Sequence, residues 1–524
     1  MLDFKKKKIM RKLIKNYGKL FVLLGVTVTS ISCSKDFLTE NPDTFVSPPL
    51  LLVNEDGAET YLLGAYDAVQ KSIAPTGNGN PAPWSIYWGS TAADEVVFPN
   101  WGGDSKIIYL HQVTPTTGKI NSLWVKLYES LNRINSVVDR IGNMTEDQID
   151  SDVKNKFIAE AKFLRTTINF ALVSSWENVP LIKNEVTTLD NINVKQATPE
   201  EIYEFMVEDL KSALTYLPSE QGGGRVTAGA VNALLGKIYL QMTGFPLNQT
   251  DKFELAEKAL ENVIDSQVYD LLPNYADVFK LDFEQSKEMV FAVGVDGPAL
   301  NEGGLLGFYF GPNGSVNNGG GWGTCHMNHH FADSYDFDND VRVINNIARH
   351  NANNTTPQQA VTDPSTWIQG KNSWRGWKWH AAKPNAYAND SPFDYPYIRY
   401  ADVLLLYAEA LNGQGKLTQT VIDNTVNRLR TRAGIPAADM MVLGSKEDNA
   451  TELLSERRKE LCFEGWRRND LIRFGKYEEA ISGITQGGPN AGNPITQFSD
   501  FEMRWPIPEA QIQLNSELIQ NPGY

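Results

Sequence analysis

The sequence is poor in cysteine, poor in positive charge and without the common signatures of catalysis. Its 524 residues include three cysteines, a number that does not indicate a disulfide framework. We expect Cys462, which lies in a helical run, to be a small buried hydrophobe. No G-x-S-x-G elbow, H-E-x-x-H pair or G-x-x-x-x-G-K-S/T loop occurs anywhere in the chain. The sequence therefore lacks the usual marks of a serine hydrolase, a zinc peptidase or a P-loop nucleotide-binding protein.

Long apolar runs are also missing, except for one near the N-terminus. Lysine and arginine crowd residues 5–19, residues 20–28 are mainly apolar, and Cys33 follows the small-residue run S-I-S. The apolar run has about half of the roughly 20 residues that a bilayer-spanning helix needs. We therefore interpret residues 1–32 as a secretory signal and Cys33 as the site of lipoprotein cleavage and lipid attachment. Ser30 departs from the usual lipobox, which has Leu three residues before the cysteine.

The charge balance is strongly acidic. The formal net charge is −15, and removal of residues 1–32 takes away eight cations and one anion, which lowers it to −22. A protein with this charge repels phosphate backbones, so a nucleic-acid partner is excluded. The remaining chain is long enough to bury a large core or two closely joined lobes.

Amphipathic helices account for most of the periodic pattern. Residues 399–412 (RYADVLLLYAEALN) place apolar or small side chains on one face at helical spacing. A second helical run covers residues 421–432 and ends at the stop signal Gly-Ile-Pro of residues 434–436. The two runs form a helical hairpin, which cannot cover its own apolar face and therefore needs stacked neighbours.

Further helical pairs occur along the chain. Residues 121–141 pair with residues 153–175, and a run that begins at Thr227 pairs with the run around residues 256–263. Small residues at positions of close helix approach follow the pattern of tetratricopeptide repeats, with a looser spacing than the ideal of about 34 residues. Residues 199–217 and 453–474 supply more helix. We predict a mainly α scaffold of about four helical pairs.

Two segments between the pairs have a different composition. Residues 75–105 and 294–400 are crowded with glycine, proline, asparagine and aromatic residues and show no sustained helical period. They are longer than connecting loops usually need to be, and long structured loops usually carry function. Residues 288–293 (EMVFAV) are a candidate for one of a few short strands beside them.

Four stretches after residue 32 form a specific combination. They are CSKDFL (33–38); AEAKFLR (159–165) with WENVPL (176–181); the helix at 399–412 with SERRKEL (455–461) and FEGWRRNDLIRFG (463–475); and WPIP (505–508) with the closing QNPGY (520–524). In this order they resemble the RagB/SusD family of outer-membrane lipoproteins, which capture glycans beside a TonB-dependent transporter.

The resemblance implies a right-handed superhelix of four tetratricopeptide-like helical pairs, with a loop-rich lobe that presents the glycan site. It divides the chain after the signal into a SusD-like N-terminal region, residues 33–290, and a RagB/SusD C-terminal region, residues 291–524. It also implies a SusC-like β-barrel transporter as partner, a surface-exposed position on the outer membrane through a lipid on Cys33, and no cofactor. It does not identify the glycan.

Aromatic side chains in the two loop segments are the candidates for ligand contact. A flat ring can cover the C–H face of a sugar while a few polar groups orient its hydroxyls. The candidates are Trp84, Trp88, Asp94 and Trp101 in the first segment and Tyr309, Trp322, Trp374 and Arg375 in the second. The competing interpretation is that the loop aromatics pack the loops onto the helices.

The densest aromatic group lies between residues 367 and 379. Trp377 and Trp379 alternate around Lys378 as in a strand, so we expect one face of this segment in the core and Trp374 in solvent. Arg375 is placed to hydrogen-bond ring hydroxyls of a sugar.

Three polar patterns have alternative interpretations. The run C-H-x-x-H-H at residues 325–330 lacks the convergent ligands that zinc needs, so we expect hydrogen-bonding histidines and no metal. Residues 336–340 (DFDND) begin like a calcium loop but lack its glycine and closing glutamate. In the charged run 456–473, Glu460 and Glu464 alternate with arginines, which predicts ion pairs against neighbouring repeats and not catalytic carboxylates.

The main hypothesis is a non-enzymatic lipoprotein that binds an oligosaccharide and passes it to a transporter. A peptide or glycoprotein ligand stays open, because exposed aromatics suit both ligand types. A further hypothesis is a glycoside hydrolase that uses carboxylates such as Asp94 and Glu95 with an acid elsewhere in the chain. The missing catalytic motifs and the family resemblance oppose it.

Overall fold

The computed structural model describes most of the chain after residue 46. The described residues are 47–76, 83–97, 102–188, 193–220, 222–295, 303–311, 326–349, 374–381, 391–482 and 499–524. The chain divides into two compact units at Leu51, and the short helix α2 (Pro48–Leu51) is the described helix of the first. The predicted signal and Cys33 lie outside the described residues. The second unit, from Leu52, contains all the elements below.

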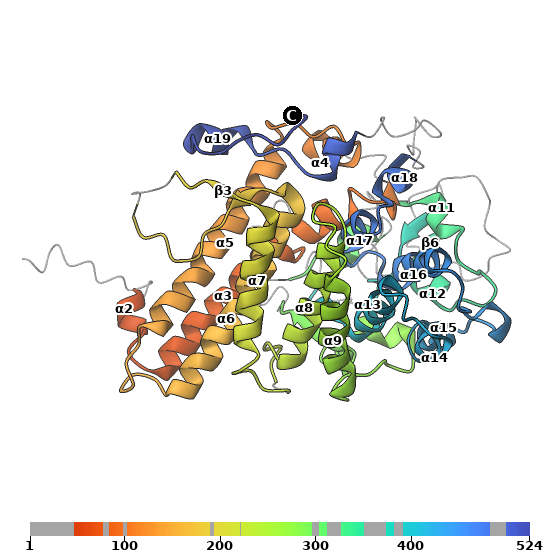
Figure 1. The fold of residues 1–524 in the computed structure, drawn as a ribbon, viewed down its shortest axis with the longest axis horizontal. Helices are drawn as coiled ribbons and strands as arrows, with labels where there is room; N and C mark the ends of the chain where they lie inside the picture. Colours follow the sequence, from red (N-terminus) through yellow and green to blue (C-terminus); the bar gives the residue numbers. More distant parts are fainter. Residues whose placement is uncertain are drawn as a thin grey trace, which may run out of the picture. The chain divides into compact units, whose positions relative to one another are not determined.

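A series of neighbouring helices forms the first half of this unit (Figure 1). They are α3 (Glu55–Ile73), α5 (Gly118–Gly142), α6 (Ser151–Trp176), α7 (Pro199–Ala213), α8 (Ala228–Thr243) and α9 (Lys252–Asp265). Each packs on the next in this order. The predicted pairs at 121–141 with 153–175 and at 227–240 with 256–263 are thereby confirmed.

Local signals explain where these helices begin. At α7, the Thr198 hydroxyl accepts from the backbone N–H of Glu201, whose side chain accepts from the backbone of Thr198 in return. Pro199 occupies the first turn, where its missing N–H costs nothing. Asp150 likewise accepts from the first N–H groups of α6. The capping residues in the sequence therefore predict where these two helices begin.

The series continues in the second half of the unit. Its helices are α13 (Tyr400–Gly413), α14 (Gln419–Asn424), α15 (Val426–Arg432), α16 (Lys446–Leu461), α17 (Arg467–Arg473) and α18 (Tyr477–Ser482). Helix α13 packs on α9 and on α16. The predicted class, mainly α with a few short strands, is confirmed, while the right-handed superhelix stays a prediction.

Two predicted helices are broken, which corrects their boundaries. The run 421–432 is interrupted at Thr425, and the run 453–474 is interrupted between α16 and α17. Gly465, with φ of 83°, lies in the second break. A Cβ built on Gly89 would lie 2.0 Å from the carbonyl oxygen of Gly465, so only two backbones without side chains can approach this closely. The break follows from a tertiary contact that no local pattern encodes.

The strands form three small antiparallel sheets among the described residues. Strand β4 (Met289–Val293) pairs with β8 (Tyr395–Arg399), which confirms the predicted strand at 288–293. Strand β2 (Val179–Pro180) pairs with β3 (Gln196–Ala197). The third sheet has the order β1-β5-β7-β6 and comprises β1 (Val96–Val97), β5 (His326–Met327), β7 (Trp374–Gly376) and β6 (Ile347–Arg349).

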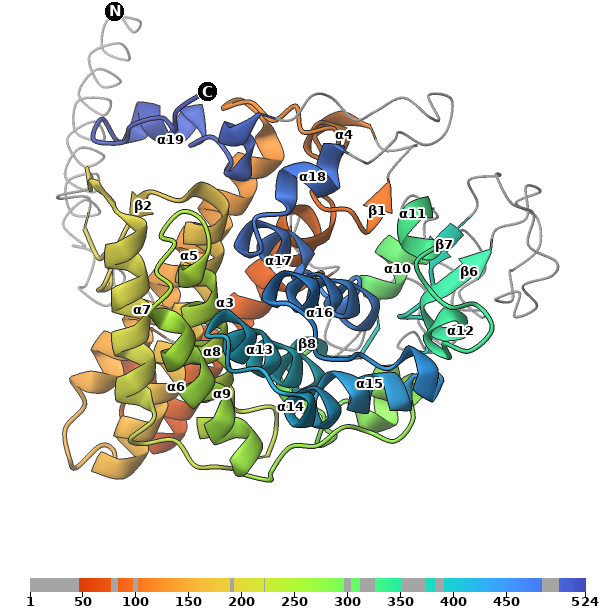
Figure 2. The same cartoon turned by 45° about the vertical axis from the view of Figure 1, so that its right-hand side comes forward.

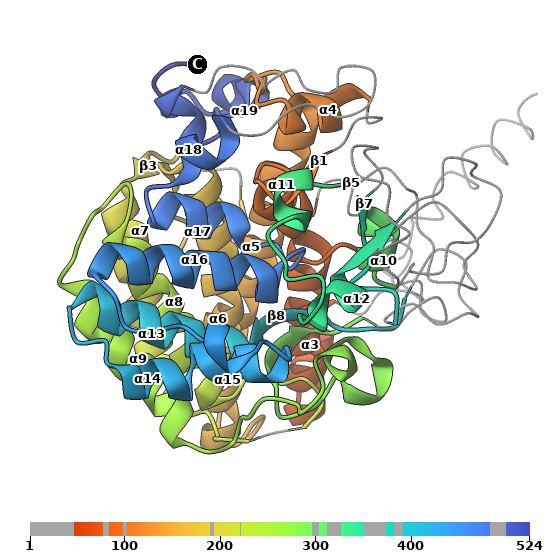
Figure 3. The same cartoon turned by 90° about the vertical axis from the view of Figure 1, so that its right-hand side faces the viewer.

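This third sheet joins the two loop segments singled out in the sequence. Strand β1 comes from the first segment and the other three strands come from the second. Short helices accompany it: α10 (Leu306–Phe310), α11 (His329–Ala332) and α12 (Arg342–Asn346). We call the four strands and these three helices the sheet region. Figures 2 and 3 show its parts gathered on one side of α16.

The remaining elements are short. They are the π-helix η2 (Ser85–Ser90), α4 (Gly103–Tyr109), the 3₁₀ helices η3 (Tyr275–Phe279), η4 (Leu281–Phe283), η8 (Ala437–Asp439) and η10 (Asp500–Met503), and α19 (Glu509–Leu514). None of the helices in the described part of the chain combines the length and the apolar character needed to cross a bilayer.

Candidate ligand-binding region

The first two predicted ligand contacts, Trp84 and Trp88, lie in the core. Both side chains are fully buried. The Trp84 indole N–H donates to the hydroxyl of Ser175 at 3.0 Å, and that of Trp88 donates to the Oδ1 of Asn469 at 2.6 Å. The prediction of exposed platforms is therefore wrong for this pair. The physical reason is that the π-helix η2, which contains Trp88 and follows directly on Trp84, packs on α17.

Asp94 is also buried and forms ion pairs. Its carboxylate accepts from Arg467 at 2.6 and 2.9 Å and from Arg458 at 2.8 Å. Burial alone would raise the Asp94 pKa, but the two guanidinium groups outweigh it and lower that pKa to about 2. The structure therefore assigns Asp94 to holding the first loop segment on α16 and α17, which corrects its prediction as a ligand contact.

Glu95 behaves in the opposite way. Burial, followed by the charge of Asp94, raises the pKa of Glu95 to about 8. Its Oε2 accepts from the backbone N–H of Phe463 at 3.2 Å. Two neighbouring carboxyls with separated pKa values can act as acid and base in a glycosidase. Here both are buried and face protein groups, so their arrangement does not support hydrolysis.

Tyr309 and the remaining tryptophans differ in position. Tyr309 lies in α10 with its ring buried, and burial raises its pKa above the ordinary value for tyrosine. Its prediction as an exposed contact is wrong, because α10 turns its aromatic residues toward the core. Trp101 and Trp322 lie outside the described residues.

Trp374 offers an accessible aromatic surface. It begins β7, is partly buried, and stacks on Phe337 with ring centroids 5.8 Å apart and an interplanar angle of 28°. Phe337 is itself partly buried, and both rings pack against the hydrophobic core. Trp377 and Trp379 belong to the core as expected, but Lys378 between them is buried as well, so this segment does not alternate as a strand would. Trp374 is partly buried, not fully in solvent. The backbone of Arg375 pairs with His326 and Ala348 at the centre of the sheet.

Sequence reasoning missed the stacking partner. Phe337 lies inside the acidic run DFDND, which draws attention as a possible calcium loop. In the structure Asp336 accepts from the backbone N–H groups of Asp338 and Asn339, and Asp340 binds Arg342. The run therefore makes a turn that presents Phe337 to Trp374. Within the described ranges, no group of three or more His, Cys, Asp or Glu side chains is arranged to hold a metal ion.

A buried charge network holds the sheet region on α16. Arg342 of α12 donates to Glu456 at 2.6 Å and to Glu460 at 3.4 Å. Lys378, which follows β7, donates to the carbonyl oxygens of Glu460 and Cys462 at 2.8 and 3.0 Å. Lys378 comes two residues after β7, so its contacts hold the end of this strand against α16.

Arg399 is the centre of the same network. Its guanidinium donates to Glu288 at 2.7 Å, to Glu464 at 2.7 and 2.9 Å and to Glu460 at 3.2 Å. The surrounding arginines hold the pKa of Glu460 at about 2 even though burial opposes this. Ion pairs in the charged run 456–473 were predicted from its spacing, and the structure confirms them.

The comparisons with known proteins agree along the whole unit. The model of the SusD family matches residues 287–524, and the family model described as "Starch-binding associating with outer membrane" matches residues 65–240. A SusD-like protein of Formosa agariphila is 25% identical over 537 residues, which cover 98% of this chain and 100% of the relative. The starch-binding protein SusD of Bacteroides thetaiotaomicron is 24% identical over 469 residues, 78% of this chain and 80% of the relative.

Solved structures show the same fold. A SusD homologue from Bacteroides thetaiotaomicron superposes with a TM-score of 0.78 at 25% identity, covering 93% of this chain and 100% of that one. A laminarin-binding SusD-like protein superposes with a TM-score of 0.71 at 24% identity, covering 90% and 100%, a likeness of fold alone. The two matched segments take in the sheet region and the helices of both halves except α9 and parts of α3 and α8, and the chain belongs to the RagB/SusD family.

Proposed function

We propose that this protein is a cell-surface, lipid-anchored protein that captures an oligosaccharide or polysaccharide. It would deliver this glycan to a SusC-like TonB-dependent transporter in the outer membrane, with the lipid on Cys33 as its anchor. Family membership supports this function, together with the starch-binding and laminarin-binding proteins among the relatives and similar structures.

The observation that carries the proposal is the stacked pair Trp374 and Phe337 beside the four-stranded sheet. A partly exposed indole offers a flat apolar face to a sugar ring, and its backing by a second ring fixes its orientation. Trp101, Trp322 and Arg375 remain proposed contacts on sequence grounds. Hydrolysis is not part of the proposed function, because Asp94 and Glu95 are committed to buried contacts.

Affinity electrophoresis tests this proposal. The protein from residue 34 onward would be run through gels that contain starch, laminarin and other polysaccharides, beside Trp374→Ala and the control Val442→Ala. Val442 is strongly exposed and distant from the sheet region in sequence, so its variant should migrate like the unaltered protein. We expect retardation by one polysaccharide that Trp374→Ala weakens. Free migration in every gel would contradict the proposal.

A further inference from the structure

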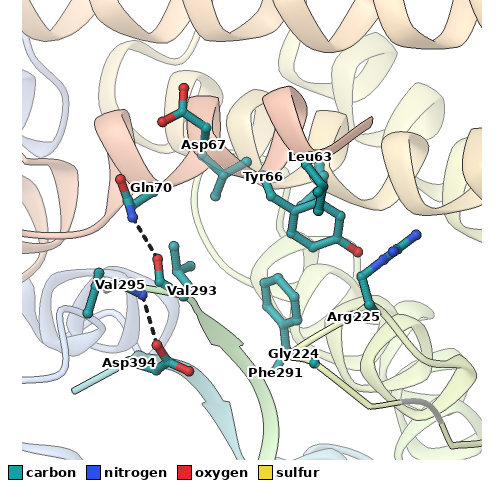
Figure 4. A pocket seen from close by; sticks show the side chains of 14 residues that line it. Leu63, Tyr66, Asp67, Gln70, Gly224, Arg225, Phe291, Val293, Val295 and Asp394 are labelled. Carbon is teal, nitrogen blue, oxygen red and sulfur yellow. Dashed lines mark hydrogen bonds between the residues drawn. The ribbon is translucent and has the colours of Figure 1, made fainter. Parts of the chain in front are cut away.

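A second hollow lies away from the sheet region, between α3 and the ends of β4 and β8. It has a volume of about 430 Å³, within the range of small-molecule sites. Figure 4 shows Leu63 and Tyr66 projecting from α3 toward Phe291 of β4, while Gln70 and Asp394 lie at the other end. Arg225 lies at the end with Leu63 and Tyr66, and Val293 and Val295 lie at the end with Gln70 and Asp394 (Figure 4). Both ends of the cavity thus combine apolar and polar groups, as a ligand with apolar faces and hydroxyl groups requires.

The polar groups of this cavity are held in place. The side-chain amide of Gln70 donates to the carbonyl oxygen of Gly294 at 2.8 Å, and Asp394 accepts from the backbone N–H of Val295 at 2.8 Å. Tyr66 donates to Glu160 at 2.5 Å, which orients its ring at the cavity wall. Rotamers fixed before binding lower the entropy that a ligand has to offset.

The hollow continues along β4. A second cavity of about 290 Å³ shares Gly224, Arg225 and Phe291 with the first. A Cβ built on Gly223 would meet no atom within 4 Å, and one on Gly224 would meet only the Gln285 amide at 4.0 Å. The backbone at Gly223 and Gly224 therefore has no side chain that separates the two cavities. Together the two cavities accommodate more than one sugar-sized ring.

The charges around the cavities select against anions. The Arg225 guanidinium donates two hydrogen bonds to Glu160, at 2.6 and 2.9 Å, and one to Glu59 at 2.8 Å. Asp67 is paired with Lys71 at 2.6 Å. Among the charged residues around the cavities, Asp394 included, carboxylates outnumber cations, so an anionic ligand would be repelled.

We propose that the cavities along β4 form a second carbohydrate site, which binds a neutral oligosaccharide of at least two rings. Tyr66, Leu63 and Phe291 face the C–H surface of a ring, and Asp67 and Gln70 accept from its hydroxyls. The site is separate from Trp374 and stands whether or not the sheet region binds glycan.

Calorimetric titration with cellobiose, maltose and laminaribiose tests this site, with cellobiouronic acid, a disaccharide that carries one carboxylate, as the anionic probe. The variants are Leu63→Arg and Asp67→Ala, and the control is Val442→Arg. Leu63 is 49% exposed and Val442 76% exposed, so neither change disturbs the core. We expect a saturable signal from at least one neutral disaccharide and none from cellobiouronic acid. Leu63→Arg and Asp67→Ala should each weaken binding at least tenfold, while Val442→Arg leaves it unchanged.

Two results would overturn the second site: no disaccharide binds, or binding is indifferent to Leu63→Arg. These results differ from failure of the proposed function, which is measured with polysaccharides and Trp374→Ala. If a disaccharide binds and Leu63→Arg weakens its binding, while the protein migrates freely in every polysaccharide gel, the second site is supported and the proposed function is contradicted. Retardation that depends on Trp374, with no disaccharide binding, would do the reverse.

Discussion

Replacement of Arg399 by methionine should destabilise the protein by about 3 kcal/mol. Arg399 is fully buried and donates to three buried glutamates, Glu288, Glu460 and Glu464. Breaking a buried ion pair by removing one partner typically costs about 3–5 kcal/mol. The lower end applies here, because Arg432 and Lys378 still compensate these carboxylates and methionine retains part of the volume.

The matched control is an arginine in an exposed pair. Arg428 contacts Asp270 at 2.5 Å, with exposed fractions of 39% and 60% for the two side chains. Its replacement by methionine should cost less than about 1 kcal/mol, since solvent screens the pair. The assay is urea unfolding followed by tryptophan fluorescence at pH 7, with midpoints compared at equal slope. Equal midpoint shifts for Arg399→Met and Arg428→Met would refute the view that the buried network stabilises the fold.

Three further outcomes are expected. The folded state holds the Glu95 proton up to a pKa of about 8, against an ordinary value of 4.5, so the stability of the protein should fall as the pH rises between these values. Glu95→Gln should make the urea midpoints depend less on pH. It should also raise the free energy of unfolding at pH 9, by about 1.4 kcal/mol for each unit by which folding raises the Glu95 pKa. An unchanged pH dependence of the midpoints would contradict the raised pKa of Glu95. Gly89→Ala should prevent folding or lower the melting temperature strongly, because its Cβ would lie 2.0 Å from the oxygen of Gly465; a normal melting temperature would contradict this contact. Burial raises the pKa of the Cys462 thiol to about 12, so peptide mapping after iodoacetamide treatment at pH 8 should find Cys462 modified only in urea.

Much of the helical scaffold could be predicted because its signals are local. Amphipathic period and capping residues lie within a few positions of each other, as at Thr198 and Glu201. The breaks near Thr425 and Gly465 could not be predicted, because the second depends on contact with Gly89, more than three hundred residues away in the chain. The dense alternation of charges in residues 456–473 correctly indicated ion pairs.

The candidate site was harder to predict than the scaffold. Composition marks Trp84 and Trp88 as loop aromatics, but only the geometry of a π-helix decides that their rings point inward. The sequence presents Asp94 as a possible ligand contact, because it does not show that Arg458 and Arg467 lie beside its carboxylate in the fold. Trp374 was expected in solvent and is partly buried, and the alternation around Lys378 did not reveal that Lys378 is buried together with Trp377 and Trp379.

The central claim is glycan capture through the Trp374 surface, and calorimetric titration of the protein from residue 34 onward with its retarding polysaccharide tests it most directly. Loss of an aromatic face worth about 1.5–3 kcal/mol corresponds to roughly a tenfold to hundredfold change in affinity. The account predicts saturable binding that Trp374→Ala weakens by this factor while Val442→Ala does not. Absence of binding to every polysaccharide, or equal affinity of the Trp374→Ala variant, would contradict it.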